Sequence, residues 1–252
     1  MKYLRQLVVG SAIGAAAALA TAGGAFADGM RAPAGAAPQV GSWSGFYFGA
    51  GTGWQWSSIQ VGPVANPETD HDSEFVGAYM GLQHQFGNIV LGVEGGWNST
   101  FRNNTGNYIC PNPAFSCEVR LDDILTIGGR LGVVGHPLPM LGSHSMLYLT
   151  GGYANGAFHY FARTPANTGP LSEEARTRNS GWYIGGGVEW RVSPGWTTGI
   201  EYRHYEFDTG SSVRWTPAGA TLSPITMDAS SDTVMFRATW TWDRPAPVRP
   251  LK

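Results

Sequence analysis

Residues 181–207 hold two alternating segments separated by a turn. In the first segment the even-numbered positions from Trp182 to Trp190 form the larger, mostly apolar set, and small or charged residues stand between them. The second segment repeats this pattern from Trp196 to Tyr202. Side chains alternate faces along a strand, so each segment predicts a strand with one apolar face. Both apolar sets are even-numbered, so antiparallel pairing requires an odd loop, which Ser193–Pro194–Gly195 supplies.

A second hairpin is predicted by the same two signals. The apolar set is even-numbered over Glu74–Phe86 and odd-numbered over Ile89–Asn98, which demands an even loop. Gly87–Asn88 is a two-residue turn of a favoured type. Side-chain parity and turn chemistry therefore agree independently at two hairpins.

Extended to the whole chain, this pattern predicts eight strands whose connections alternate between long and short. Alternating connections and an even strand count are typical of transmembrane barrels. The fold class predicted is all-β, an eight-stranded antiparallel up-and-down transmembrane β-barrel with short periplasmic turns and four long external loops. The predicted strands are Gly45–Trp56, Glu74–Phe86, Ile89–Asn98, Val119–Val134, Met146–Tyr160, the two segments within 181–207, and Asp232–Trp242.

Tryptophans near the strand ends favour a membrane barrel over a secreted sandwich or a lipocalin-like barrel. A sandwich buries its apolar faces against each other, whereas tryptophans at strand ends form the interfacial girdles of a barrel in lipid. Aromatic residues make up 12% of the chain and charged residues only 13%. The predicted aromatic girdle comprises Trp54, Trp56, Trp97, Trp182, Trp190, Trp196, Trp240 and Trp242.

The N-terminus has the organisation of a secretory signal peptide. Basic residues precede an alanine-rich apolar run, and Ala25–Phe26–Ala27 ends it with small residues. An N-terminal membrane helix is the alternative, but polar interruptions and the missing basic flank disfavour it. The predicted organisation is a signal peptide at 1–27, a flexible periplasmic linker at 28–42, the outer-membrane barrel at 43–242 and a Pro-rich periplasmic tail at 243–252.

Charged residues on the inward faces predict an ion-pair network in the barrel lumen. An eight-stranded barrel is just wide enough for side chains to fill, and buried charges there must pair. The network is either a polar plug, which the narrow lumen favours, or a rearrangeable path for ions. Its predicted members are Glu94, Asp122, Arg130, Glu189, Arg191, Glu201, Arg203 and Arg237.

The chain has two cysteines, Cys110 and Cys117, in a turn-rich segment. In an oxidising compartment they are expected to form a disulfide, with a metal pair as the weaker alternative. The near-zero net charge gives no reason to expect a nucleic-acid partner. No cofactor site or metal site is predicted.

Enzymatic activity is not expected. Some eight-stranded outer-membrane barrels hydrolyse lipid A, and His204 invites that comparison, but Glu206 stands where a serine nucleophile would be needed. The long loops are better suited to recognition, because loops on a rigid scaffold commonly carry it. Nothing in them specifies a ligand.

Several segments resemble the Omp25/Omp31-type outer-membrane β-barrel (porin-like) family of α-proteobacteria, which is similar in architecture to the OmpA transmembrane domain. They are Trp43–Tyr47, Thr126–Gly132, Thr150–Ala154 and Gly187–Trp190 with Glu201–Tyr202.

The resemblance implies an eight-stranded barrel in the outer membrane of a Gram-negative bacterium, in contact with lipopolysaccharide, phospholipid and the assembly machinery. Members are variously described as structural proteins, antigens, adhesins, haem binders or porins. The chain departs from the pattern in continuing past Trp242 with a Pro-rich tail. We therefore expect a structural or surface-interaction barrel that meets a surface ligand or peptidoglycan. A narrow diffusion pore is the alternative, and a lipid-modifying enzyme is a weaker one.

Overall fold

The computed structural model describes residues 42–62, 69–103, 106–110, 115–135, 144–163, 171–208, 211–214, 222–225 and 227–242. Almost all of these residues lie in β-strands. Eight long strands are β1 (Gly45–Val61), β2 (Thr69–Phe86), β3 (Ile89–Asn103), β5 (Ser116–Gly135), β6 (Ser145–Arg163), β7 (Leu171–Ser193), β8 (Trp196–Phe207) and β11 (Met227–Trp242). Three short strands are β4 (Gly106–Tyr108), β9 (Ser211–Arg214) and β10 (Leu222–Ile225).

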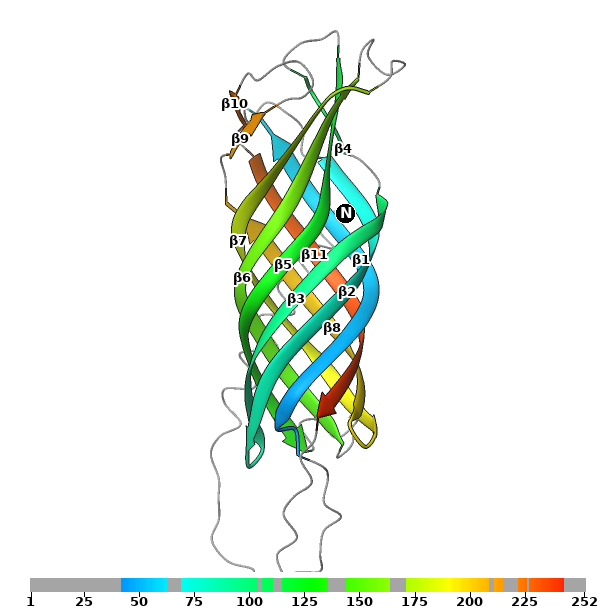
Figure 1. The fold of residues 1–252 in the computed structure, drawn as a ribbon, viewed down its shortest axis with the longest axis vertical. Coiled ribbons are helices and arrows are strands. Elements are labelled where there is room, and N and C mark those ends of the chain that lie inside the picture. Colours follow the sequence, from blue (N-terminus) through cyan, green and yellow to red (C-terminus); the bar gives the residue numbers. More distant parts are fainter. Residues whose placement is uncertain are drawn as a thin grey trace, which may run out of the picture. The chain divides into compact units, whose positions relative to one another are not determined.

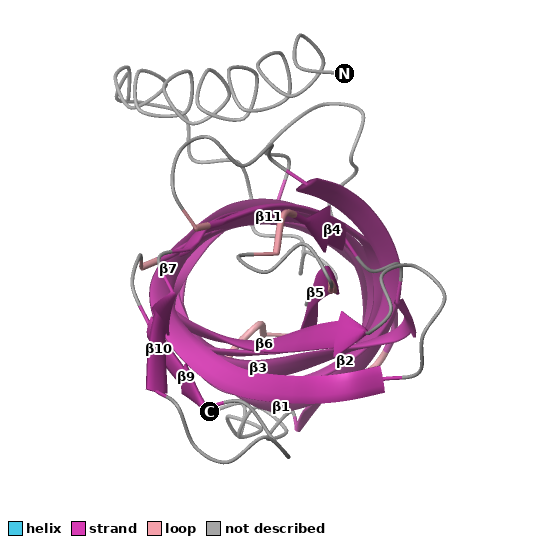
Figure 2. Cartoon of the chain, turned by 90° about the horizontal axis from the view of Figure 1, so that it is seen from above, coloured by secondary structure: helices cyan, strands magenta, loops and turns pink. Residues whose placement is uncertain are grey.

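The eight long strands form a closed antiparallel barrel (Figures 1 and 2). Neighbours follow the order β3-β2-β1-β11-β8-β7-β6-β5, and pairing of β3 with β5 closes the ring. The first strand, β1, therefore pairs with both β2 and the last strand, β11. The short strand β4 pairs with β5, while β9 and β10 pair only with each other. The predicted fold class is confirmed.

The barrel has a turn end and a loop end. At the turn end, Gly87–Asn88 joins β2 to β3 as predicted, and Gly87 has a φ of 60° that favours glycine. The other turn differs from the prediction, because Ser193 pairs with Trp196 and only Pro194–Gly195 form the turn. An irregularity between Arg191 and Ser193 supplies the extra residue that parity requires. The segment 136–143 lies outside the described residues.

Toward the loop end the strands run beyond their predicted limits. β1 continues to Val61 and β7 begins at Leu171, although the sequence predicted loops at 57–73 and 161–180. β5 and β6 pair over this whole extension, as far as Ser116 and Arg163. Parts of the predicted long loops are therefore barrel wall.

Apart from a few register shifts, side chains alternate between the two faces of the barrel wall. The outward set is apolar and exposed over the turn-end half, as in Met80, Leu82 and Val93. The inward set is buried and contains tyrosines, polar groups and charges. This arrangement reverses the usual distribution in a water-soluble protein.

A β-bulge in β5 corrects one part of the predicted pattern. The sequence placed Leu121 outward and Asp122 inward, in phase with Leu125 and the residues after it. The register shifts between Leu121 and Asp123, so one residue is left over at Asp122. Leu121 is therefore buried in the interior, whereas Leu125 is exposed.

Candidate functional site: the barrel interior

Six charged side chains from five strands meet inside the turn-end half of the barrel. We call them the ionic layer. All six are almost fully buried, and each pairs with at least one member of opposite charge. The members are Glu94 on β3, Arg130 on β5, Glu189 on β7, Glu201 and Arg203 on β8, and Arg237 on β11.

Arg237 is the centre of the ionic layer. Its Nη2 lies 2.6 Å from Glu94 Oε2, and its Nη1 lies 2.7 Å from Glu201 Oε2. Its Nε lies 3.4 Å from Glu189 Oε1, so one guanidinium contacts all three carboxylates. β3 and β11 are separated by β1 and β2 in the ring, so the contact with Glu94 crosses the lumen.

The other two arginines complete the layer. Arg203 contacts Glu94 at 2.6 Å and Glu201 at 2.7 Å, and Arg130 contacts Glu189 at 2.6 Å. Three arginines thus balance three glutamates. Planar guanidinium forks suit this arrangement because they bind carboxylates in fixed geometry.

Tyrosines enclose the ionic layer. The Tyr148 hydroxyl donates to Glu201 Oε2 at 2.9 Å, and the Tyr47 hydroxyl donates to Glu94 Oε2 at 3.0 Å. The guanidinium carbon of Arg130 lies 3.7 Å from the Tyr148 ring centroid, and that of Arg237 lies 3.7 Å from the Tyr79 centroid. These contacts add cation–π stabilisation to the ion pairs.

Glycine neighbours make room for these long side chains. A Cβ at Gly81 would lie 2.5 Å from the Tyr47 ring, and one at Gly187 would lie 2.7 Å from the Tyr148 hydroxyl. In register, Glu94 stands between Gly81 and Gly128 on its two neighbouring strands. The high glycine content of the strands therefore has a packing role in the lumen.

Two residues predicted for the network have other partners. Asp122 occupies the bulge in β5, where it pairs with Arg120 and lies 3.4 Å from His159 Nδ1. Arg191 lies at the turn end, where its guanidinium carbon is 5.0 Å from the Trp43 ring centroid. Including these two in the ionic layer was wrong, because the bulge displaces the first and the second lies beside Trp43.

The loop-end half of the interior contains an apolar cluster and, in place of buried ion pairs, uncharged polar side chains such as Gln55, Ser57 and Ser231. The ring centroids of Phe158 on β6 and Phe207 on β8 lie 5.4 Å apart, and the Tyr160 hydroxyl on β6 lies 3.0 Å from Met227 Sδ on β11. These contacts join strands that are not neighbours, so side chains meet across the lumen. We call this cluster the apolar layer, and its larger members are Ile59, Val61, Val119, Leu121, Ile124, Phe158, Tyr160, Tyr183, Tyr205, Phe207 and Met227.

At the turn end, Trp43 packs into the lumen. Its ring is 2% exposed and clusters with Val90, Val134, Met146 and Tyr148, all on inward faces. Gly45 has a φ of 146°, which glycine adopts readily and which directs the preceding chain back toward the barrel axis. The sequence placed Trp43 only at the start of the barrel, and its inward position was not predicted.

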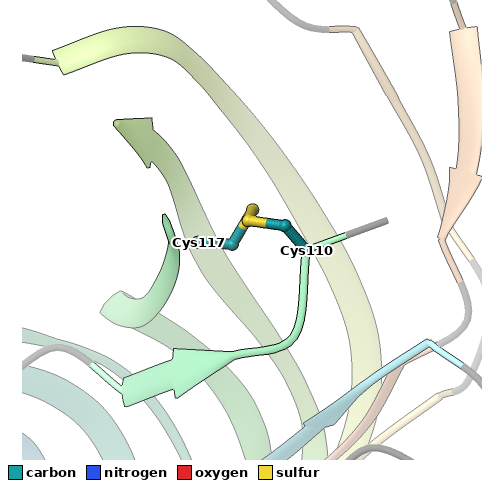
Figure 3. Close-up of a disulfide and its surroundings, with 2 residues drawn as sticks. All are labelled: Cys110 and Cys117. Atoms are coloured by element: carbon teal, nitrogen blue, oxygen red, sulfur yellow. A yellow bond between two sulfur atoms is a disulfide. The ribbon is translucent and has the colours of Figure 1, made fainter. Parts of the chain in front are cut away.

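The disulfide expected between Cys110 and Cys117 is present (Figure 3). It links Cys110, which follows β4, to Cys117, the second residue of β5, and the two Cα atoms are 5.4 Å apart. Cys117 belongs to the apolar layer, and Cys110 and Phe115 pack against it. The bridge therefore fixes a loop-end segment to the interior.

The predicted girdle tryptophans all lie on the outward face. Trp54, Trp56, Trp97 and Trp182 are exposed toward the loop end, and Trp196 and Trp242 are exposed toward the turn end. The remaining two, Trp190 and Trp240, are partly covered. Trp240 packs against Phe48, with ring centroids 5.2 Å apart.

His204 lies on the outward face near the loop end. Its Nδ1 is 2.8 Å from Asp232 Oδ1, and its Nε2 is 3.4 Å from Glu206 Oε1. Carboxylates thus face both nitrogens, and none of these groups is a nucleophile of the hydroxyl or thiol type. Among the described residues, no group of three or more histidines, cysteines and acidic residues is placed to hold a metal ion.

The closed ring, the exposed apolar face and the buried charges define a barrel that spans a membrane with its strands. A family model described as "Outer membrane protein beta-barrel domain" matches residues 13–237. The chain belongs to this family, and the protein resides in the outer membrane. Its outward face is therefore in contact with membrane lipid, its short turns face the periplasm and its loop end is external.

Several solved outer-membrane proteins are similar to this chain at low sequence identity. OprG from Pseudomonas aeruginosa is 13% identical, with a TM-score of 0.47, over 81% of this chain and 99% of that chain. AlkL is 11% identical, with a TM-score of 0.43, over 88% and 100% of the two chains. Ail of Yersinia pestis is 8% identical, with a TM-score of 0.35, over 77% and 99%. No curated protein matches the chain. No helix among the described residues is long and apolar enough to cross a membrane.

Proposed function

We propose that this protein is a structural and surface-interaction barrel of the outer membrane whose lumen is sealed by side chains. The observation that carries the proposal is the contact of Arg237 with three carboxylates across the lumen. A conducting pore needs a continuous file of water. In an eight-stranded barrel, side chains fill the interior and leave little room for such a file.

Three layers in series support a sealed lumen. Trp43 closes the periplasmic end, the ionic layer occupies the periplasmic half above it and the apolar layer crosses the external half. An ion that crossed the ionic layer would still have to enter an apolar zone, where charge is costly to desolvate. Rearrangement of the ion pairs alone would therefore not open a path.

Planar-bilayer conductance of the refolded, full mature chain tests this proposal. We expect no reproducible openings in salt, and an Arg237→Met variant that still folds should also stay silent because the apolar layer remains. Reproducible, salt-dependent openings of the wild-type protein would support the alternative, a narrow diffusion pore of the porin type.

The surroundings of the barrel follow from this proposal. We assign the eight outward tryptophans to the two membrane interfaces, where aromatic girdles lie. The linker at 28–42 and the tail at 243–252 then act as periplasmic spacers within reach of peptidoglycan. The external loops serve as the recognition surface. We further propose that the chain has a role like that of Omp25/Omp31-type barrels, that the assembly machinery inserts it and that it is not an enzyme.

A further inference from the structure

A row of three basic side chains crosses the outward faces of β5, β6 and β7 in the external half of the barrel. Arg120 is in register with His159, and His159 is in register with Arg176. The Arg120 Nη2 lies 3.3 Å from His159 Nδ1, and Arg176 Nε lies 3.3 Å from His159 Nε2. We call these side chains, together with Arg178, the basic strip.

The row has more donors than the imidazole can accept. A neutral imidazole accepts at one nitrogen only, so it satisfies one of the two flanking arginines. A protonated ring accepts at neither nitrogen and adds a third positive charge to the row. Like charges on adjacent strands are unfavourable, so the row calls for anions.

Carboxylates supply part of this demand. Glu174 lies 3.1 Å from His159 Nε2, Asp122 pairs with Arg120, and Asp123 lies 2.8 Å from Arg178 Nη2. In the last pair the Arg178 side chain is 47% exposed and the Asp123 side chain only 22%. Arg178 Nη1 also donates to Asn155 Oδ1 at 3.1 Å. The exposed part of the guanidinium is available to a further anion.

The other half of the barrel is different at this end. The outward faces of β1, β2, β8 and β11 carry acidic residues beyond the tryptophans and, over the described residues, no arginine. Among the described residues, outward arginines of the external half are thus gathered on β5–β7, whereas β8 carries an outward histidine, His204, that is held between two carboxylates. The acidic residues are Asp70, Asp72, Glu74, Glu206, Asp228 and Asp232.

The basic strip lies at the height of lipid headgroups. Arg178 precedes Trp182 by four residues on β7, which is about 13 Å along the strand and about 10 Å along the barrel axis at the usual tilt. Tryptophans mark the interface in membrane barrels, so Arg178 reaches just beyond it. Arginine forks bind phosphate bidentately.

We propose that the basic strip binds the phosphate groups of a glycolipid in the outer leaflet, with Arg120, Arg176 and Arg178 as the ligands. The phosphate groups accept hydrogen bonds from the arginine N–H groups for which His159 has no acceptor. The side of the barrel formed by β5–β7 would then face phosphorylated lipid. This inference rests on the outer-membrane location and is independent of whether the lumen conducts.

The test measures how lipid A protects the refolded, full mature chain in detergent micelles. The readout is the temperature at which the heat-modifiable, compact gel mobility is lost, recorded against the concentration of bisphosphorylated lipid A. Dephosphorylated lipid A and a soluble phosphorylated polysaccharide are titrated in parallel. The variants are R120Q/R176Q/R178Q and, as a matched change on the acidic half, D72N/D228N.

We expect bisphosphorylated lipid A to protect the wild type at concentrations at least about tenfold lower than the dephosphorylated form, as loss of one charge-assisted contact implies. The triple variant should lose this preference, and D72N/D228N should keep it. Mobility without lipid shows whether each variant is folded. If the triple variant folds poorly, the single variant R178Q, at the most exposed of these pairs, takes its place and should weaken the preference. Equal protection by both forms, a preference retained in the triple variant, or equal protection by the soluble polysaccharide would overturn the proposal.

Discussion

The two halves of the barrel interior are filled by opposite chemistry. The periplasmic half contains the ionic layer, in which one guanidinium contacts three carboxylates. The external half contains the apolar layer, where aromatic and aliphatic side chains meet across the lumen. On the outward face the order is reversed: apolar residues cover the periplasmic half, and polar residues are more frequent in the external half.

This contrast shows that the polarity of the inward face and that of the outward face both change along the barrel axis, and in opposite directions. Where lipid lies outside, the wall exposes apolar residues and the interior can be polar. Where water and headgroups lie outside, the interior can form an ordinary dry core. Ion pairs demand exact stoichiometry and geometry, while dispersion contacts tolerate changes of shape. The two layers should therefore respond differently to substitution.

The largest effect is expected from Arg237→Met. It leaves Glu94, Glu189 and Glu201 with two arginines, and an uncompensated buried charge costs about 3–5 kcal/mol. Urea unfolding of the refolded barrel in detergent micelles measures the loss. The control combines Arg237→Met with Glu201→Gln, which restores the charge balance and should regain part of the stability. A single variant as stable as the wild type would show that the layer is hydrated.

Leu121→Ala tests the apolar layer in the same assay. Truncating a buried leucine should cost about 3 kcal/mol. Leu121→Met keeps the volume and should cost less than about 1.5 kcal/mol. Arg237→Lys is equally conservative in charge, yet it should be costly because the planar fork is lost. Equal tolerance of Leu121→Met and Arg237→Lys would remove the distinction between the layers.

Removing the disulfide should have a smaller effect. The double variant Cys110→Ser/Cys117→Ser frees a short segment, and closing a loop of this length is worth about 2–3 kcal/mol in the chain-entropy model. Protease sensitivity of the external segment after reduction provides the measurement. Thiol labelling of the intact, unreduced protein should modify neither cysteine, and labelling of both would contradict the bridge.

The smallest effect is expected from Tyr148→Phe. It removes one hydrogen bond to Glu201, and a hydrogen bond to a charged group contributes about 1.5 kcal/mol or somewhat more. Tyr153→Phe is the matched control, because its hydroxyl contacts Ser180 on the exposed face. The unfolding free energy of Tyr153→Phe should be close to that of the wild type. Equal losses in both variants would argue that burial adds nothing to the Tyr148 bond.

The barrel itself could be predicted from side-chain parity and turn residues. No tertiary information was needed to predict the Gly87–Asn88 turn or the tryptophan-bearing strands within 181–207. The extension of β1 was missed because the polarity of the alternation inverts there, with Ile59 and Val61 inward and Gln60 outward. Because the outward positions of this segment are polar, it lacks the apolar outward face by which the strands were recognised, and the sequence predicted a loop.

All six members of the ionic layer could be predicted from parity, since each stands on the inward face of a regular strand segment, but two further residues were predicted for the network. Asp122 was misplaced because a single extra residue in β5 flips every side chain before it, and the sequence carries no turn residue that marks the bulge. Trp43 lies before the first strand, so side-chain alternation does not predict the direction of its ring.

The position of Trp43 has a consequence for how the protein folds. It belongs to a buried cluster with side chains from β3, β5 and β6, and its backbone nitrogen donates to Gln85 Oε1 on β2 at 2.9 Å. That socket exists only after most of the wall has assembled, so Trp43 docks late. Its indole fluorescence should therefore change in the final kinetic phase of insertion, and that change would report when the barrel closes.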